Sequence, residues 1–299
     1  MSSTTDPRID QALVDAIAAL GNRTRLEILL ALAEAEREHR TQGYRLSFTE
    51  LYNAIDVEST SQFSYHLTQL VGQFVAETPD GYRLTYSGDR IVRTVLSGLY
   101  EHSRSFDAID VDGVCVFCEK STLAAAVDEE HFVVRCRSCE STLLTDLLPR
   151  SQTRGRSAAA VVDSVGTRIW GSRVLVAGGV CPVCYGRADA AVDAHRSGDR
   201  HLYTVDHTCR ECRLAVHIPL EATAAFHPAA IGFFWDHGIS LQDRPLWEFF
   251  EFIVTGAVTA DVAAVDPLEA TVEISLDGET LRLAVDDDLR VTTVPADDR

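Results

Sequence analysis

Lysine is almost missing from this 299-residue sequence, because 26 of its 27 basic residues are arginine and only Lys120 is a lysine. A Walker-type phosphate loop needs a lysine before its Ser or Thr, since the ammonium group neutralises the terminal phosphates. The nearest pattern runs from Gly166 to Gly171 and Ser172 and contains no lysine. Nucleotide hydrolysis by that route is therefore excluded.

Long apolar runs are missing as well, and no segment approaches the roughly 20 apolar residues that a membrane-spanning helix needs. Residues 1–10 are polar and acidic. We therefore expect a soluble, cytoplasmic protein that does not bind membranes. Its length and its 46% of hydrophobic residues predict two or three domains with sizeable cores.

Acidic residues outnumber basic ones by 45 to 27, and the formal net charge is -18. The charge is -6 over residues 1–110, -3 over 111–150, +1 over 151–240 and -10 over 241–299. Because no segment is strongly basic, any contact with DNA has to come from local arginines and neutral donors. The acidic, lysine-poor composition resembles that of proteins from extremely halophilic archaea, although an ordinary acidic cytosolic protein remains the alternative.

The first hundred residues show the pattern of a helix-turn-helix followed by a β-hairpin. A first helix ends before Gly21, and a leucine-rich helix follows that we expect at the centre of a small core. Two capping boxes, which begin at Ser47 and Ser59, open two short helices that a tight turn joins. The turn Pro79-Asp80-Gly81 then predicts a hairpin in the place of a wing, and a last helix is expected over residues 89–106.

The helix that Ser59 opens would present short or planar polar groups on the side opposite its apolar residues. Such groups can donate to phosphates or read base edges in the major groove, and arginines near the hairpin can hold the backbone or the minor groove. A merely solvated face, or a module that only dimerises, would show the same polarity. The candidate DNA contacts are Ser59, Ser61, Gln62, Ser64, Tyr65, His66, Gln69, Arg83 and Arg90.

Residues 19–29 (ALGNRTRLEIL) and 63–70 (FSYHLTQL) together resemble the ArsR family of winged-helix transcription regulators. The resemblance covers about the first third of the chain. It implies a homodimer formed through the first and last helices, with the second helix of the helix-turn-helix in the major groove. Residues 1–110 contain no cysteine, and the expected last helix has only His102, so the metal sites of metal-sensing members are not matched.

All eight cysteines fall into two groups of Cys-x-x-Cys pairs. Two residues between ligands let one turn point both thiolates at one ion, and two such pairs supply the tetrahedral sulfur set of structural zinc. The sequence therefore predicts two zinc ribbons, each with one structural Zn²⁺ and no open position for catalysis. The ligands are Cys115, Cys118, Cys136 and Cys139 in the first and Cys181, Cys184, Cys209 and Cys212 in the second.

Other uses of these cysteines stay open: redox disulfides, an iron-sulfur cluster, or one ribbon that has lost its metal. The two groups echo each other, because Gly-Val directly precedes both first pairs and Cys-Arg-x-Cys forms both second pairs. We interpret them as a degenerate repeat. Histidines between the pairs are expected at the surface or beside the ligands: His131, His195, His201 and His207.

Taken together, these patterns predict an α+β protein: a winged helix-turn-helix over residues 1–108 and a C-terminal region over 109–299. The aromatic helix after Pro245 is interpreted as core, with a ligand pocket or a subunit contact as alternatives. His237 beside Asp236 lacks a nucleophile, so no enzyme is expected. The C-terminal region divides into ribbon 1 (111–150), a helical connector (151–176), ribbon 2 (177–220), helices (221–262) and a β-hairpin or meander (268–295).

The function expected from the sequence is that of a dimeric regulator of transcription that binds double-stranded promoter DNA. The zinc ribbons would contact a partner, such as a protein of the transcription machinery, or an effector. Two alternatives remain: an interaction adaptor that binds no DNA, and a thiol sensor in which oxidation ejects zinc.

Overall fold

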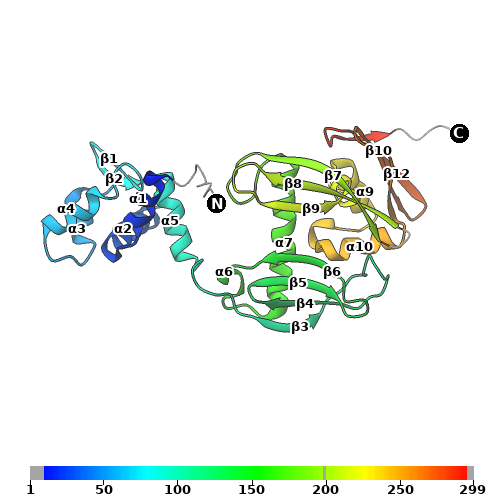
Figure 1. Cartoon of the computed structure of the whole chain (residues 1–299), viewed down its shortest axis with the longest axis horizontal. Coiled ribbons are helices and arrows are strands. Elements are labelled where there is room, and N and C mark those ends of the chain that lie inside the picture. The colour runs from blue at the N-terminus through cyan, green and yellow to red at the C-terminus, as the bar shows by residue number, and fades with distance from the viewer. Residues whose placement is uncertain (1–9, 198–199, 295–299) are drawn as a thin grey trace, which may run out of the picture. The chain divides into compact units, whose positions relative to one another are not determined.

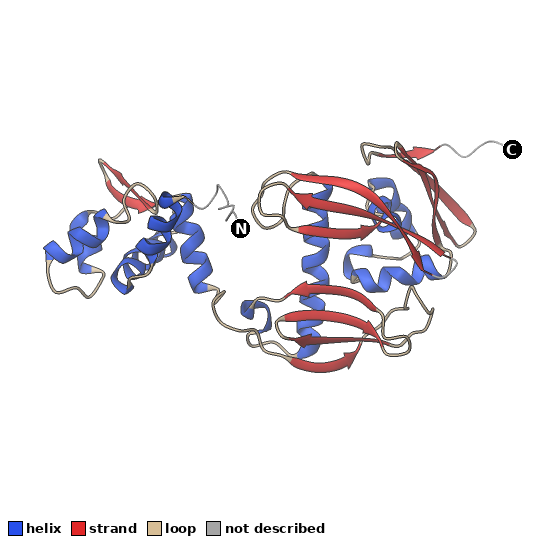
Figure 2. Cartoon of the chain, in the orientation of Figure 1, coloured by secondary structure: helices blue, strands red, loops and turns tan. Residues whose placement is uncertain are grey.

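The computed structural model describes residues 10–197 and 200–294 and shows a mixed α+β protein (Figures 1 and 2). The chain divides into two compact units, residues 1–102 and 103–299. We expected the boundary at residue 108, but it lies earlier, because residues 103 and 104 already contact the second unit. The amides of Ser103 and Arg104 donate to Glu130 and Thr153 of the second unit.

The described part of the first unit consists of five helices and one two-stranded sheet. The capping box predicted at Ser47 is present, whereas the one predicted at Ser59 shows only the bond from the Gln62 amide. Asn22 accepts from the Arg25 amide, Ser47 and Glu50 form a reciprocal capping box, and Ser59 accepts from the Gln62 amide. The elements are α1 (Gln11–Leu20), α2 (Arg23–His39), α3 (Phe48–Asn53), α4 (Thr60–Thr68), β1 (Val75–Thr78), β2 (Gly81–Leu84) and α5 (Tyr86–Leu96).

The core of the first unit gathers around α2, which confirms the central place expected for the leucine-rich helix. Ile28, Leu29 and Leu32 of α2 are buried against Leu51 of α3 and Phe63 of α4. Strands β1 and β2 pair antiparallel with Thr78 opposite Gly81, so the turn holds only two residues. Gly81 has a φ of 123°, and a Cβ there would lie 2.4 Å from the carbonyl oxygen of Leu46.

The last helix of the first unit differs from the prediction of residues 89–106. It begins three residues earlier, at Tyr86, because Thr85 caps it, and it ends at Leu96. Gly98 then takes a left-handed φ of 70°, which is the usual conformation after a helix end. The expected continuation to Phe106 is wrong, because Phe106 begins a strand of the second unit.

Over its described residues, the second unit contains three sheets, all of them antiparallel (Figure 2). The first sheet has the order β3-β4-β5-β6, the second β7-β8-β9 and the third β10-β11-β12-β13. The strands are β3 (Phe106–Asp110), β4 (Leu123–Asp128), β5 (His131–Cys136), β6 (Thr142–Leu147), β7 (Ala188–Ser197), β8 (Arg200–Cys209), β9 (Ala215–Pro219), β10 (Val258–Val265), β11 (Leu268–Leu276), β12 (Glu279–Val285) and β13 (Val291–Val294).

Helices lie between and against these sheets, and one continuous apolar core runs through the unit. The long helix α7 contacts β3 and α10, and α8 contacts β8, β9 and β10. Among the described residues, no helix combines the length and the apolar character needed to span a membrane. The helical elements are α6 (Arg150–Thr153), α7 (Ala158–Ala177), α8 (Leu220–Ala224), α9 (Pro228–Asp236), the short 3-10 helix η1 (Leu241–Asp243) and α10 (Leu246–Val254).

The aromatic helix α10 forms core, as expected. Trp247 and Phe249 are fully buried, and the Trp247 ring lies 5.8 Å from the ring of Phe132 in β5. Gly113, just before the first cysteine pair, packs on the backbone of the same helix. A Cβ at Gly113 would lie 3.0 Å from the carbonyl oxygen of Trp247, and the φ of 121° disfavours any side chain.

The C-terminal sheet is larger than the hairpin or meander expected over residues 268–295. The segment 258–265 joins it as β10 rather than extending the preceding helices to residue 262. Val258 is buried, and half-buried positions then alternate with exposed ones along β10, which is the period of a strand with one face toward the core. Residues 295–299 lie outside the described part of the chain.

The contact at Gly113 generates a prediction about stability. We expect Gly113→Ala to lower the free energy of unfolding by about 1–3 kcal/mol, because alanine would take a strained φ against a backbone oxygen. Gly171→Ala is the matched control, since Gly171 lies in α7 and an added Cβ would meet no atom within 4 Å beyond the helix's own neighbouring backbone; it should stabilise by up to ~1 kcal/mol. Chemical unfolding of the metal-loaded chain measures both changes, and an equal effect of the two substitutions would contradict this packing.

Candidate metal centres and nucleic-acid interface

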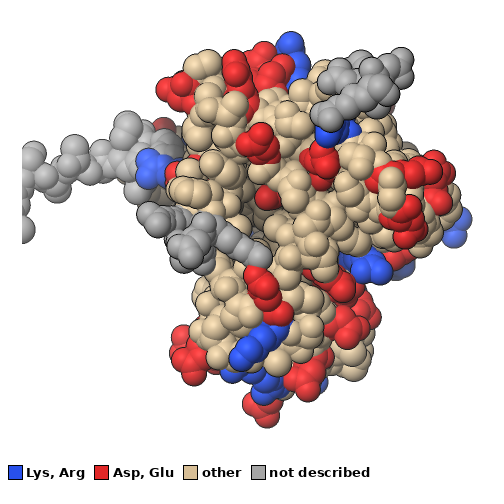
Figure 3. All heavy atoms as spheres, turned by 90° about the vertical axis from the view of Figure 1, so that its right-hand side faces the viewer, with Lys and Arg blue, Asp and Glu red and all other residues tan. Residues whose placement is uncertain are grey.

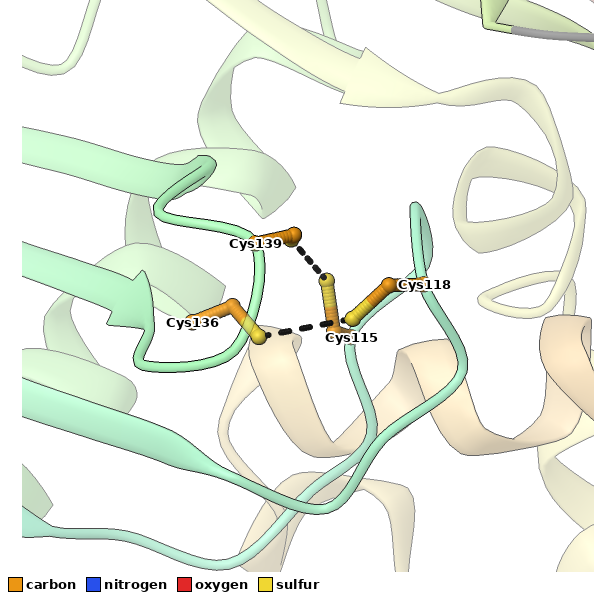
Figure 4. Close-up of side chains that lie close together, drawn as sticks. All are labelled: Cys115, Cys118, Cys136 and Cys139. Carbon is orange, nitrogen blue, oxygen red and sulfur yellow. Dashed lines mark hydrogen bonds between the residues drawn. The ribbon is translucent and has the colours of Figure 1, made fainter.

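Each cysteine group brings together two loops of one sheet. Cys115 and Cys118 precede β4, while Cys136 ends β5 and Cys139 lies in the turn before β6. The β4-β5 hairpin places Leu123 opposite Cys136, so both pairs meet at the same end of the sheet. Figure 4 shows their four side chains converging on one point. We call this set the first cysteine cluster.

The second cysteine cluster is built in the same way around the β7-β8 hairpin. Cys181 and Cys184 lie between α7 and β7, whereas Cys209 ends β8 and Cys212 lies in the turn before β9. Ala188 stands opposite Cys209, which again brings the two pairs together. The repeat expected from the sequence is therefore present in the strand order as well.

The sulfur positions fit a single ion in each cluster. The closest sulfurs lie 3.6 Å (Cys115 and Cys139) and 3.5 Å (Cys118 and Cys136) apart in the first, and the second repeats these distances. All four sulfurs of a cluster lie within 4.8 Å of one another. Four thiolates at ~2.3 Å from a tetrahedral ion stand about 3.8 Å apart, whereas a disulfide needs ~2.05 Å. All eight cysteines are free, so this geometry favours metal binding over disulfides.

The same backbone turn recurs at all four Cys-x-x-Cys pairs. The residue after the second cysteine donates its amide to the carbonyl of the first cysteine, over 2.8 to 3.2 Å. That residue has a left-handed φ of about 60° in every case although it is never glycine. The four residues are Glu119, Glu140, Tyr185 and Arg213. Four matching turns with this conformational cost indicate that the sulfur geometry, rather than local propensity, fixes the loops.

The first cluster stabilises one thiolate by hydrogen bonds alone, without a metal ion. Burial alone raises the pKa of Cys136, but hydrogen bonds from the Thr122 hydroxyl and from the amides of Cys139 and Ser138 outweigh it and bring the pKa to about 6. In contrast, burial raises the pKa of Cys115 to about 12. The cluster thus holds one ready thiolate beside thiols that cannot ionise together unless a cation compensates their charge.

The thiols of the second cluster also differ widely in pKa. The Cys212 amide lowers the pKa of Cys209 to about 6. The Leu214 amide lowers the pKa of Cys212, but burial and hydrogen bonds shared with the other three thiols raise it to about 12. Amides of Val183 and Gly186 also donate to cluster sulfurs, at 3.4 Å. Both clusters could hold a metal ion, and their soft, closed sulfur sets are consistent with zinc.

The second candidate site is the outward face of α4 in the first unit. Phe63 and Leu67 are buried on one side, whereas the Tyr65 side chain remains 58% exposed on the other. The guanidinium carbon of Arg25 lies 6.0 Å from the Tyr65 ring, a contact that the sequence analysis did not include. The exposed residues on this face and at the N-cap are Ser59, Ser61, Gln62, Ser64, Tyr65 and Gln69.

His66 does not belong to this face, and its expected role as an outward DNA contact is wrong. Its side chain is only 8% exposed, and its Nδ1 atom has no hydrogen-bond partner. Burial, together with the positive charge of Arg25, lowers the pKa of His66. His66 points inward because it lies three residues after Phe63 in α4, and residues three apart share one side of a helix.

The two arginines proposed near the hairpin occupy different elements. Arg83 lies in β2, half-buried, and donates to the carbonyl oxygen of Leu84 at 3.1 Å. Arg90 lies in α5 and is exposed, so it belongs to the last helix rather than to the hairpin. The Arg90 side chain is therefore open to solvent, whereas one guanidinium nitrogen of Arg83 already bonds to the backbone of β2.

Comparisons with known proteins identify the second unit by family. Residues 112–291, more than half of the chain, match the family described as Domain of unknown function (DUF7351). The chain belongs to this family. A second match, to Domain of unknown function (DUF7347), covers residues 14–95. No curated protein and no solved structure matches the chain.

The two family matches separate the two candidate sites. Both cysteine clusters and all three large sheets lie in or overlap the DUF7351 region, while α4 and the hairpin lie within the DUF7347 region. The clusters are thus part of the DUF7351 core, and the α4 surface belongs to a separate module.

The cluster geometry predicts the metal content of the protein. We expect two equivalents of a divalent metal per chain, measured by mass spectrometry of the metal against the protein concentration. Cys118→Ser and Cys184→Ser should each lose one equivalent, because a serine hydroxyl is a poor ligand beside three thiolates.

The control is Ser138→Ala, which alters an exposed residue between two ligands and should keep both equivalents. A native chain that carries no metal when purified without chelators would contradict the assignment, as would cysteine variants that keep both ions.

Proposed function

We propose that the protein is a cytoplasmic, dimeric DNA-binding regulator of transcription, with a winged helix-turn-helix in its first unit. The observation that carries the proposal is the asymmetry of α4. One side of this short helix is sealed in the core, and the other presents Ser61, Gln62, Ser64, Tyr65 and Gln69 to solvent. A helix of this kind, preceded by α3 and a short turn and followed by a hairpin, suits insertion into the major groove.

The chemistry of the α4 face agrees with an acidic protein that must approach an acidic polymer. Its exposed groups are hydroxyls and amides, which can donate to phosphates or bases without a net charge. Arg25 and Arg90 would add local positive charge. Because few phosphates would be neutralised, we expect affinity to depend only weakly on salt concentration.

Exposed apolar side chains on α1 and α5 support a homodimer. Leu13, Val14 and Ile17 of α1 are exposed, and so are Leu96 at the end of α5 and Tyr100 beyond it. Apolar side chains that gather on two helices usually mark a protein contact. A second copy of the chain would cover both helices and place two α4 helices on one duplex, as winged-helix dimers do.

For the second unit we propose two zinc ribbons with one structural Zn²⁺ each. Four thiolates close the coordination sphere, so the ions would brace the sheets rather than bind substrate. The ribbons would then offer surfaces to a protein of the transcription machinery or to an effector.

An interaction adaptor that binds no DNA is the second candidate, because the cysteine turns carry exposed apolar residues. Phe117 and Val183 lie between ligands, and Tyr185 directly follows one. Rigid loops that hold apolar side chains in solvent suit a protein partner. In that case the α4 face would also bind protein.

A gel-shift series tests the proposal with duplexes that cover the region upstream of the gene. The double variant Gln62→Ala, Tyr65→Ala should weaken specific binding at least tenfold, because each base contact contributes about 1–3 kcal/mol. The control pair is Gln42→Ala, Tyr86→Ala, which removes the same residue types at exposed positions outside α4. It should bind as the native chain does.

Failure of the native protein to bind any of the duplexes specifically, or an equal loss in both double variants, would contradict the DNA-binding proposal. Retention of both metal ions in each variant shows that the second unit is unchanged, and circular dichroism checks the helices of the first.

A further inference from the structure

A group of metal-binding side chains gathers on the outer face of the second sheet, away from the cysteines. Val205 of β8 and Ile218 of β9 point into the core. Their sequence neighbours therefore point to the opposite face, because side chains alternate along a strand. Asp193 pairs in register with Thr204, and Asp206 pairs with His217, so these side chains share that face.

Three of these residues bring their ligand atoms together. One atom each from Asp193, His195 and Asp206 lies within 4.8 Å of the others. The three residues come from two neighbouring strands of the longest hairpin of the chain, so the backbone ladder fixes their separation. Asp193 and His195 are exposed, and Asp206 is half-buried, so an ion could reach them from solvent.

Neighbouring side chains orient two of the three ligands. The Nε2 atom of His195 lies 2.9 Å from the Thr204 hydroxyl, and a hydroxyl that accepts from Nε2–H leaves the lone pair on Nδ1. The Nδ1 atom of His217 lies 2.8 Å from Oδ1 of Asp206, which holds this carboxylate in place. Partners of this kind position the ligands in many metal sites.

The chemistry of this group differs from that of the cysteine clusters. One imidazole and two carboxylates suit a divalent transition metal of intermediate softness, and three protein ligands leave positions open to water. An exposed, open site exchanges its ion more readily than a closed set of four thiolates. We propose that Asp193, His195 and Asp206 form a third metal site, which binds an exchangeable divalent transition-metal ion. This site does not depend on the proposed DNA-binding function.

Calorimetric titration of Zn²⁺ into protein whose cysteine clusters are already loaded tests the third site. We expect one further equivalent in the native chain. His195→Ala should weaken this step at least about tenfold, and the double variant Asp193→Asn, Asp206→Asn should lose it. His201→Ala is the matched control, because His201 is also exposed and lies on β8 outside the ligand group; it should bind as the native chain does.

A second measurement needs no substitution of a ligand. In nitrogen-labelled protein, the imidazole signals of His195 should shift when the third equivalent is added, while those of His201 should not. Absence of a further equivalent, an unshifted His195, or a full third equivalent in the double aspartate variant would overturn the proposal.

Discussion

The convergence of four cysteine sulfurs in each cluster, a geometry that could hold one metal ion, is the constraint on which the second unit depends. Each cluster ties two loops of one hairpin sheet at a single point, and four non-glycine residues adopt left-handed conformations there. In the absence of a cation, hydrogen bonds and burial leave one thiol of each cluster with a pKa of about 6 and another near 12, so the four charges cannot form together. The free energy of binding an ion would offset these costs and would then be part of the free energy of folding.

The two units differ in the charge and polarity of the surfaces described above. On the face drawn in Figure 3, which is the right-hand side of Figure 1, acidic side chains are scattered over the surface and basic ones are fewer. Residues 241–299 alone carry 14 acidic against 4 basic residues. Such a surface repels phosphates, so an approach to DNA would fall to the neutral face of α4. Carboxylates also serve another purpose on β7 and β8, where Asp193 and Asp206 lie close enough to His195 to hold a metal ion.

Much of this architecture could be predicted from local sequence signals. Regular Cys-x-x-Cys spacing was enough to group all eight cysteines, and Ser47 with Glu50 was enough to place the start of α3, because both signals act over three residues. Predictions failed where contacts between residues distant in the sequence determine the structure. His66 was expected on the outward face, yet the turn of α4 places it on the same side as Phe63. Residues 258–262 were expected at the end of a helical region, yet they pair with β11 as part of a strand. The left-handed cysteine turns and the contact of Arg25 with Tyr65 could not be foreseen, since neither follows from residue type.

If each cluster holds one ion, sulfur alone should surround that ion. X-ray absorption at the edge of the bound metal measures this shell directly in the full-length chain, after dialysis has removed the exchangeable ion proposed at Asp193, His195 and Asp206. For zinc, the account predicts an average of four sulfur neighbours at ~2.3 Å and no nitrogen or oxygen in the first shell. A mixed sulfur and nitrogen shell, or a short metal-metal distance of the kind that iron-sulfur clusters show, would contradict it.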